Sequence, residues 1–295
     1  MDGRSVHFFD DQRHPSRAAG YGELELYPLS KLSLRLGGRL DWFDIYGESL
    51  SPRVAVVYTP NYRTALKYIY GEAFRAPNAY ENYFSDGVVL VAPLSPLKPE
   101  TMRSHELIME HGFAPWLQFV FDASQNHLRD LIDQIPDAST GLTHFVNVGR
   151  NRGRAIEVEM EAKGSSGLAA RASYTLADAN DERQPMRLAN SPMHMAKLNG
   201  IIPIRRSFFG AELLYASSQR SYQDTNVPSS ILTNFTWSTR RLWNAWELSA
   251  SCYNCLDREW FSPAGPELRQ AQLAQDGRTF RFKISYRWHS EQASK

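Results

Sequence analysis

No stretch of this sequence is apolar for long enough to form a membrane-spanning helix. The longest apolar run, residues 87–94, is short and ends at a proline, whereas a helix needs about 20 apolar residues to cross a bilayer. Transmembrane helices are therefore excluded. A transmembrane β-barrel is still allowed, because its strands alternate and its mean hydropathy, −0.45 here, can resemble that of a soluble protein.

Cysteine is scarce. Cys252 and Cys255 are the two in the chain, and they lie within a predicted strand, where residues three apart point to opposite faces. A redox CxxC motif needs a helix N-terminus, and a zinc site needs more ligands. We therefore expect two unpaired cysteines with a structural role.

A charge imbalance and a targeting segment are also missing. Lys and Arg number 33 against 32 Asp and Glu, which leaves a net charge of +1, so the total charge indicates no nucleic-acid partner. Residues 1–15 lack the basic and apolar regions of a signal peptide. Either the protein is cytoplasmic or this chain lacks its true beginning.

Catalytic motifs are absent as well. The sequence has no nucleophile elbow, P-loop or dinucleotide fingerprint and no credible Ser/His/Asp constellation, so we predict neither an enzyme nor a cofactor. His105, Glu106, Glu110 and His111 do not form an HExxH motif, and on a strand His105 and Glu106 face opposite ways. We expect histidines on a strand wall and no metal site.

Two charged segments have both a functional and a structural interpretation. Glu157, Glu159 and Glu161 could serve as paired catalytic carboxylates, but a polar face that lines a water-filled lumen needs only charge. Residues 149–154, GRNRGR, could bind phosphate or lipopolysaccharide, although a solvated start of a strand is the commoner role. We expect the structural role in both segments.

What the sequence does contain is faultless alternation over residues 278–288, RTFRFKISYRW. Basic and hydroxyl side chains fall on one face of an extended strand, and the other face carries Phe280, Phe282, Ile284, Tyr286 and Trp288. This segment is longer than the usual five or six residues of a strand in a soluble protein. Its length suits a tilted strand that crosses a bilayer with about 9–11 residues. It predicts a strand with one face in water and its aromatic face in an apolar medium, which could be the core of a soluble sandwich or a lipid bilayer.

The same alternation recurs along the chain, for example in residues 31–42 and 154–163. Arg or Lys on the lipid face costs about 2–4 kcal/mol at the midplane, so a one-residue slip of such strands is strongly disfavoured. About thirteen strands are predicted, roughly at 18–27, 31–46, 52–60, 62–75, 101–114, 116–128, 153–162, 167–178, 187–202, 207–218, 229–240, 243–256 and 278–288.

Short and long connections take turns between these strands. The short ones are at 27–31, 59–63, 114–116, 163–167, 203–207 and 239–243, and the others, mostly longer, at 47–51, 76–100, 129–152, 178–187, 218–229 and 257–277. Alternate connections of an antiparallel meander share one end of the sheet, and tight turns at one end with long loops at the other are typical of outer-membrane barrels. The sequence therefore predicts an all-β, antiparallel transmembrane β-barrel meander.

The strand parity predicts an incomplete barrel. The chain ends on the periplasmic side, but the first strand starts on the outer side, whereas a complete bacterial barrel has an even strand count with both ends in the periplasm. We expect an irregular segment at residues 1–17, a partial barrel at 18–288 and a C-terminal tail at 289–295.

Several motifs give a family resemblance. The pattern GxAFRAP, formed by Gly71, Ala73, Phe74, Arg75, Ala76 and Pro77, resembles TonB-dependent outer-membrane receptors. Residues 97–110, 147–161, 187–199 and 248–260, the last with Asn254 and Asp257, are similar to further motifs of that family in the right order. Cys255 stands where the family usually has Leu, Ile108 where it often has Gly, and a tail follows Trp288.

The resemblance implies a 22-stranded barrel plugged by an N-terminal domain that contacts TonB. Neither the plug nor the early strands occur in this sequence, so we expect a truncated C-terminal barrel portion that cannot transport by itself and contacts TonB only through the missing plug. The implied location is the outer membrane. The implied partners are its lipid, the barrel-assembly machinery and a nutrient ligand such as a metal chelate: a ferric siderophore, haem or cobalamin.

Two consequences and one alternative complete the expectations. The alternation of short and long connections assigns the aromatic face of the last strand to lipid and Trp288 to the periplasmic rim. The resemblance implies that this strand closes the barrel in a whole receptor; in this chain it should present an unpaired edge, or pair irregularly with residues 18–27. The alternative is a soluble, non-enzymatic all-β binding protein with a ligand site in its long loops. A barrel enzyme of the outer membrane is disfavoured because it would need catalytic residues that the sequence does not show.

Overall fold

The computed structural model describes residues 14–183, 186–239, 242 and 245–288. The predicted segment 289–295 and most of 1–17 lie outside this range. Within it the chain is almost entirely β-structure, with the single turn of helix α1 (Ala79–Tyr83) between strands. No helix of the described part is long and apolar enough to cross a membrane.

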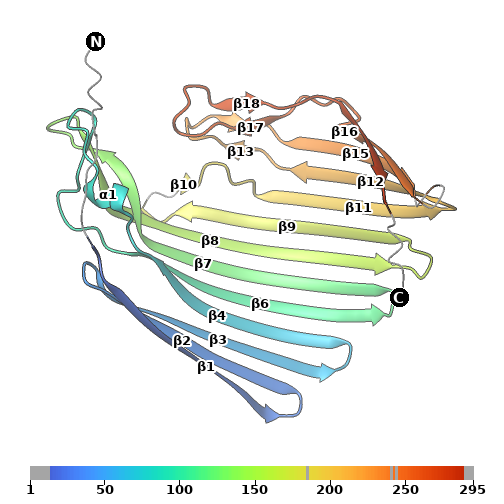
Figure 1. The fold of residues 1–295 in the computed structure, drawn as a ribbon, viewed down its shortest axis with the longest axis horizontal. Helices are drawn as coiled ribbons and strands as arrows, with labels where there is room; N and C mark the ends of the chain where they lie inside the picture. Colours follow the sequence, from blue (N-terminus) through green and yellow to red (C-terminus); the bar gives the residue numbers. More distant parts are fainter. Residues whose placement is uncertain (1–13, 184–185, 240–241, 243–244, 289–295) are drawn as a thin grey trace, which may run out of the picture. The chain divides into compact units, whose positions relative to one another are not determined.

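Thirteen strands form the main sheet, and they correspond one to one with the thirteen predicted segments. They are β1 (Arg17–Leu29), β2 (Leu32–Phe43), β3 (Gly47–Asn61), β4 (Thr64–Arg75), β6 (Glu100–Ala114), β7 (Leu117–Pro136), β8 (Thr143–Lys163), β9 (Ala169–Asp181), β11 (His194–Ile204), β12 (Ser207–Ala216), β15 (Ser230–Thr239), β16 (Trp246–Tyr253) and β19 (Thr279–Tyr286). The spatial order follows the sequence order, as an antiparallel meander requires (Figure 1). The predicted fold class is confirmed.

The order begins at β1 and ends at β19, and the sheet is not closed. Among the described residues, β1 pairs with β2 and β19 pairs with β16. Each of the two end strands therefore has a hydrogen-bonded neighbour on one side, which leaves a row of backbone groups for another strand.

The chain divides into two compact units. Unit 1 comprises residues 1–108, 124–154 and 179–186, and unit 2 comprises residues 109–123, 155–178 and 187–295. Unit 1 therefore contains β1–β4, α1 and one end of β6–β9. Unit 2 contains the other end of β6–β9 and all strands from β11 onward.

Six short strands lie in the connections. They are β5 (Leu90–Val91), β10 (Met186–Arg187), β13 (Gln219–Arg220), β14 (Asn226–Val227), β17 (Phe261–Pro263) and β18 (Gln272–Ala274). β5 pairs with β8, β13 with β14 and β17 with β18. The sequence did not predict them, because two or three residues give no readable alternation.

Two predicted loops are wrong. Residues 47–51 were expected to connect two strands, but they belong to β3, and the turn is at 44–46. Residues 129–152 were expected to connect two strands, but β7 runs on to Pro136 and β8 starts at Thr143, so the connection is only 137–142. Both faces of these strand extensions carry polar residues. Backbone pairing continues there without the apolar alternation by which the strands were predicted.

Buried apolar side chains are few in the described residues. They are Leu90, Leu97, Phe145, Val227 and Ala264, and every one lies outside β1–β4, β6, β7, β9, β11, β12, β15, β16 and β19. The large apolar side chains of those strands are instead exposed or half-buried; Phe282, for example, is 77 % exposed. The strands are thus amphipathic without a core between them.

Candidate functional site

The GxAFRAP motif lies where β4 ends, and its arginine joins three elements of unit 1. The Arg75 guanidinium donates to both carboxylate oxygens of Glu100 at the start of β6, at 2.6 and 2.8 Å, and to both of Glu81 in α1, at 3.0 Å each. Such bidentate pairs fix geometry as well as charge. A further hydrogen bond runs from the Ile132 N–H of β7 to Glu100 Oε1 at 2.8 Å.

The residues around Arg75 fix the start of the loop that follows. Asn78 and Glu81 form a capping box at the N-terminus of α1, and the Pro77 carbonyl accepts a 3.0 Å hydrogen bond from the Tyr46 hydroxyl. Phe74 packs edge-on against Phe43 of β2, with ring centroids 5.7 Å apart.

The motif begins with a glycine in the interior of β4. Gly71 lies beside Ser104 of β6, whose hydroxyl donates to the Gly71 carbonyl at 3.3 Å. The motif residues lie at the end of β4 and the start of the following loop, where they stabilise the backbone and offer no reactive group. They are Gly71, Ala73, Phe74, Arg75, Ala76 and Pro77.

Asn147 forms a second clamp in unit 1. The sequence did not predict this role, although Asn147 is the first residue of the motif at 147–161. The Asn147 side chain donates to the carbonyls of Lys98 at 2.8 Å and Asp130 at 2.7 Å, and accepts from the Lys98 N–H at 2.7 Å. It ties the loop before β6 to β7 and β8. Beneath this loop Leu90, Leu97 and Phe145 form a small buried cluster.

Asn254 and Asp257 form the equivalent clamp in unit 2. Asn254 is 4 % exposed; its amide donates to the Arg258 carbonyl at 2.8 Å and accepts from the Arg258 N–H at 3.0 Å. Asp257 accepts from the Arg278 N–H at 2.8 Å. Both have positive φ, 47° and 52°, a conformation that Asn and Asp tolerate better than most residues, so they turn the chain out of β16 and back to β19.

The cysteine prediction is wrong. Cys252 and Cys255 form a disulfide. β16 ends at Tyr253 and Asn254 turns the chain, so Cys255 lies beyond the strand and the opposite-face argument does not apply to it.

The glutamates of β8 lie opposite cations and hydroxyls of β9 in unit 2. Glu159 and Glu161 lie 3.2 and 3.8 Å from the Arg171 guanidinium, and Glu157 accepts from the Thr175 hydroxyl at 2.9 Å. Their carboxylates are thus compensated along the polar face, as a wet strand wall requires.

The histidines of β6 lie against aromatic rings. His105 Nδ1 is 2.9 Å from the Tyr68 hydroxyl, and the His111 ring lies 4.7 Å from that of Phe113. Among the residues that the structure describes, no group of three His, Cys, Asp or Glu side chains has the geometry of a metal site.

Residues 149–154 contribute to a polar pocket of unit 1. Arg150 and Arg152 line it together with Glu182, Asp181 and Arg183. Arg183 is paired with Asp181 at 3.0 Å, and carboxylates offset most of the positive charge.

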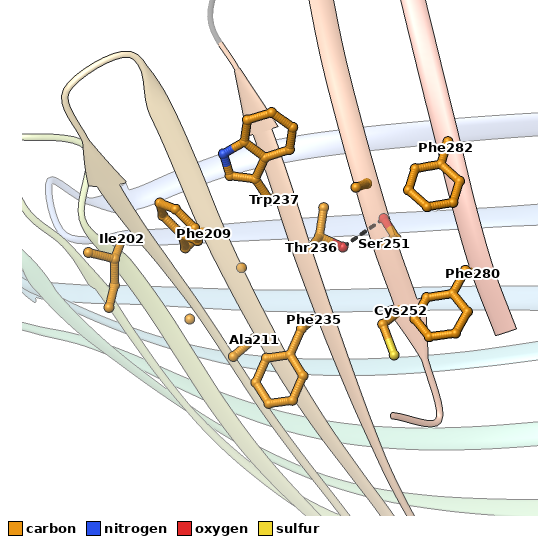
Figure 2. Close-up of a pocket in the computed structure, with 13 residues that line it drawn as sticks. Ile202, Phe209, Ala211, Phe235, Thr236, Trp237, Ser251, Cys252, Phe280 and Phe282 are labelled. Atoms are coloured by element: carbon orange, nitrogen blue, oxygen red, sulfur yellow. Dashed lines mark hydrogen bonds between the residues drawn. The ribbon is translucent and has the colours of Figure 1, made fainter. Parts of the chain in front are cut away.

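A large apolar groove lies on the last five strands of unit 2. Its volume is about 620 Å³, and its lining includes Ile202, Phe209, Phe235, Trp237, Ala250, Phe280 and Phe282 (Figure 2). Phe280 and Phe282 belong to the predicted closing strand, and the other three apolar residues of that strand, Ile284, Tyr286 and Trp288, are also exposed to varying extents.

The fold and this distribution of side chains define the class: an antiparallel meander of long amphipathic strands with structured loops at one end. The sequence model described as "TonB dependent receptor-like, beta-barrel" matches residues 3–255. The chain belongs to this family. No curated protein sequence matches it.

Solved structures show the same fold at low sequence identity. The siderophore receptor PirA from Acinetobacter baumannii has a TM-score of 0.76 at 16 % identity, with 92 % of this chain and 46 % of that chain covered. The copper transporter OprC gives 0.75 at 17 %, covering 92 % and 47 %. A ferric enterobactin receptor of Pseudomonas aeruginosa, PfeA, gives 0.74 at 18 %, covering 92 % and 45 %. This chain spans less than half the length of these receptors and transporters.

Proposed function

We propose that this chain contributes barrel wall and outer loops to a TonB-dependent receptor that takes up a scarce nutrient across the outer membrane. The nutrient class is a ferric siderophore, haem or cobalamin, bound by the loops and the polar face. A plug domain elsewhere in the receptor would contact TonB, and the barrel-assembly machinery would insert the strands.

The observation that carries the proposal is the missing core between amphipathic strands. A soluble protein buries the apolar face of its sheet against another layer. Here Phe235, Phe280 and Phe282 are more than half exposed, whereas the opposite face of the same strands carries polar contacts such as Asn234 to Glu212 at 2.6 Å. Lipid is the medium that accepts the first face, and a water-filled lumen accepts the second.

The loops support a receptor role because they are ordered by side-chain clamps. Arg75 and Asn147 each join a loop to strand ends, and the Asn254 N–H joins its loop to β15 through the Asn234 side chain. A pre-organised loop surface loses less entropy when it binds a ligand. The family and its structural neighbours support receptor or transporter chemistry over an enzyme.

The test is fractionation of the full chain expressed with an added signal peptide. We expect it in the outer-membrane fraction, extractable only with detergent, with heat-modifiable migration in electrophoresis. A monodisperse, detergent-free soluble monomer would refute the proposal and favour the soluble binding protein. A panel of ferric siderophores, haem and cobalamin titrated onto the extracted protein then tests the nutrient class.

A further inference from the structure

We propose that the apolar groove of unit 2 is a binding site for one phospholipid of the periplasmic leaflet, with an acyl chain in the groove and the phosphate at Arg205 and Arg206. This rests on the proposed function, because it needs the aromatic face of these strands to lie in a membrane.

Two cross-strand rows of side chains build the groove. The strand registers align Ile202, Phe209, Trp237, Ala250 and Phe282 in one row, and Gly200, Ala211, Phe235, Cys252 and Phe280 in the other. All ten line the groove (Figure 2). Residues directly opposite on adjacent strands share a face, so the rows form one continuous surface.

Alternation of large and small residues makes that surface concave. The aromatic rings of β12, β15 and β19 stand up from it, whereas Ala211, Ala250 and Gly200 form its low points. A Cβ placed on Gly200 would meet nothing within 4 Å, so the space above it is open. A bilayer leaves no such apolar hollow empty, and a flexible hydrocarbon chain is the component that fits it.

The end of the groove nearest the β11–β12 turn offers positive charge. β11 ends at Ile204 and β12 begins at Ser207, so Arg205 and Arg206 are the turn. Both are exposed, and neither has an ion pair or hydrogen bond with another described residue. Arg suits a phosphate because its planar guanidinium can donate two parallel hydrogen bonds.

Distances along the strands match a lipid. Ile202 lies two residues before the end of β11, and Phe280, the groove residue of β19 farthest from the end of that strand, lies six residues before it. At about 3.4 Å per residue, the groove therefore starts about 7 Å from the arginine turn and reaches about 20 Å from the end of β19 along the strand. A strand tilt of about 45° reduces this to a depth of about 14 Å, which lies within the roughly 15 Å hydrocarbon depth of one leaflet. The turn is also at the end of the short connections, which the barrel topology assigns to the periplasm.

The experiment is native mass spectrometry of the full chain, extracted in detergent and exposed to dioleoyl phosphatidylglycerol at a series of concentrations. We expect one phospholipid to be retained per chain. The double variant Arg205→Gln/Arg206→Gln should weaken retention by about tenfold, because each cation near an anionic lipid surface contributes favourably. Ala250→Phe should also weaken it by filling the groove, whereas Arg205→Lys/Arg206→Lys should restore much of the affinity.

The matched control is Arg63→Gln, which removes an exposed cation from the short turn between β3 and β4, a turn that does not line the groove. It should leave retention unchanged. Undiminished retention in the Arg205/Arg206 double variant, preference for lipid A, displacement by inorganic phosphate alone, or occupation of the face by a second copy of the chain would overturn the inference. A chain that enters the membrane but retains no phospholipid refutes this site alone, and one that never enters it refutes the proposed function.

Discussion

At the scale of single residues, polar side chains near the strand ends organise the loops. Arg75 and Asp257 hold their loops through charged hydrogen bonds, and Asn147 and Asn254 do so through amide groups that donate and accept at once. All four lie in segments that the sequence identified as family motifs, and the structure assigns each a set of backbone or carboxylate partners. Glu81 and Glu100 belong to the same network, but no spacing rule identifies them as the partners of Arg75.

Removing the Arg75 guanidinium should loosen the loop between β4 and β6. Glu81 and Glu100 would lose a bidentate partner, at a cost of about 1–2 kcal/mol because Arg75 is half exposed. We expect Arg75→Gln to lower hydrogen-exchange protection in residues 76–99 without loss of the strands. Arg63→Gln is the charge-matched control. Unchanged protection in the Arg75 variant would show that the network contributes nothing to loop order.

A pH effect belongs to the loop 137–142. The Ser139 hydroxyl and the N–H groups of Ser139 and Thr140 donate to the Asp137 carboxylate, which lowers the pKa of Asp137 from 3.8 to about 2. A lowered pKa stabilises the folded loop above about pH 4, and that contribution is lost as pH falls toward 2. Amide exchange at Thr140 and Gly141 should rise across this window, and Asp137→Asn should remove the step. A step that persists in the variant would assign it to another group.

At the scale of the element, β11 illustrates an apolar face and a polar face on one strand. On β11, Leu198 lies opposite Leu213 of β12 and Ala172 of β9, whereas the adjacent Asn199 lies opposite Glu212 and Arg171. Leu198 therefore lies on the apolar face of the strand, and its neighbour Asn199 lies on the charged face.

This pair gives a direct test of the register. Leu198→Lys should destabilise the membrane-inserted chain by about 2–4 kcal/mol if it faces the bilayer midplane, whereas Asn199→Lys, beside Glu212, should be nearly neutral. Urea unfolding in phospholipid vesicles measures both. Equal effects of the two variants would contradict the assignment of the faces.

At the scale of the whole molecule, the sheet ends at β1 and β19 with one neighbour each, and the related solved structures are more than twice as long as the matched region. Under the proposed function, energised uptake depends on a plug domain that contacts TonB. We therefore expect the 295-residue chain, expressed alone with a signal peptide in a receptor-deficient strain, to restore no TonB-dependent siderophore uptake. The matched positive control is an intact receptor in the same strain, and uptake by the chain alone would contradict the prediction.

The sequence by itself determined the meander, the two faces of the alternating strands and the family, because period-two alternation and the order of short motifs are local properties. It predicted all thirteen strands of the meander. It did not predict the ends of β7 and β8, where both faces are polar and the alternation disappears, nor the Cys252–Cys255 disulfide, which depends on the turn at Asn254.

Only the tertiary structure decided which residues from distant segments meet. The Arg75 network, the Asn147 clamp and the groove above Ala250 each join residues from separate strands, and cross-strand pairing places them together through a register that no single segment contains. β19 illustrates both contributions. The alternation in its sequence places the aromatic residues on one face, and its pairing with β16 makes that face one wall of a groove.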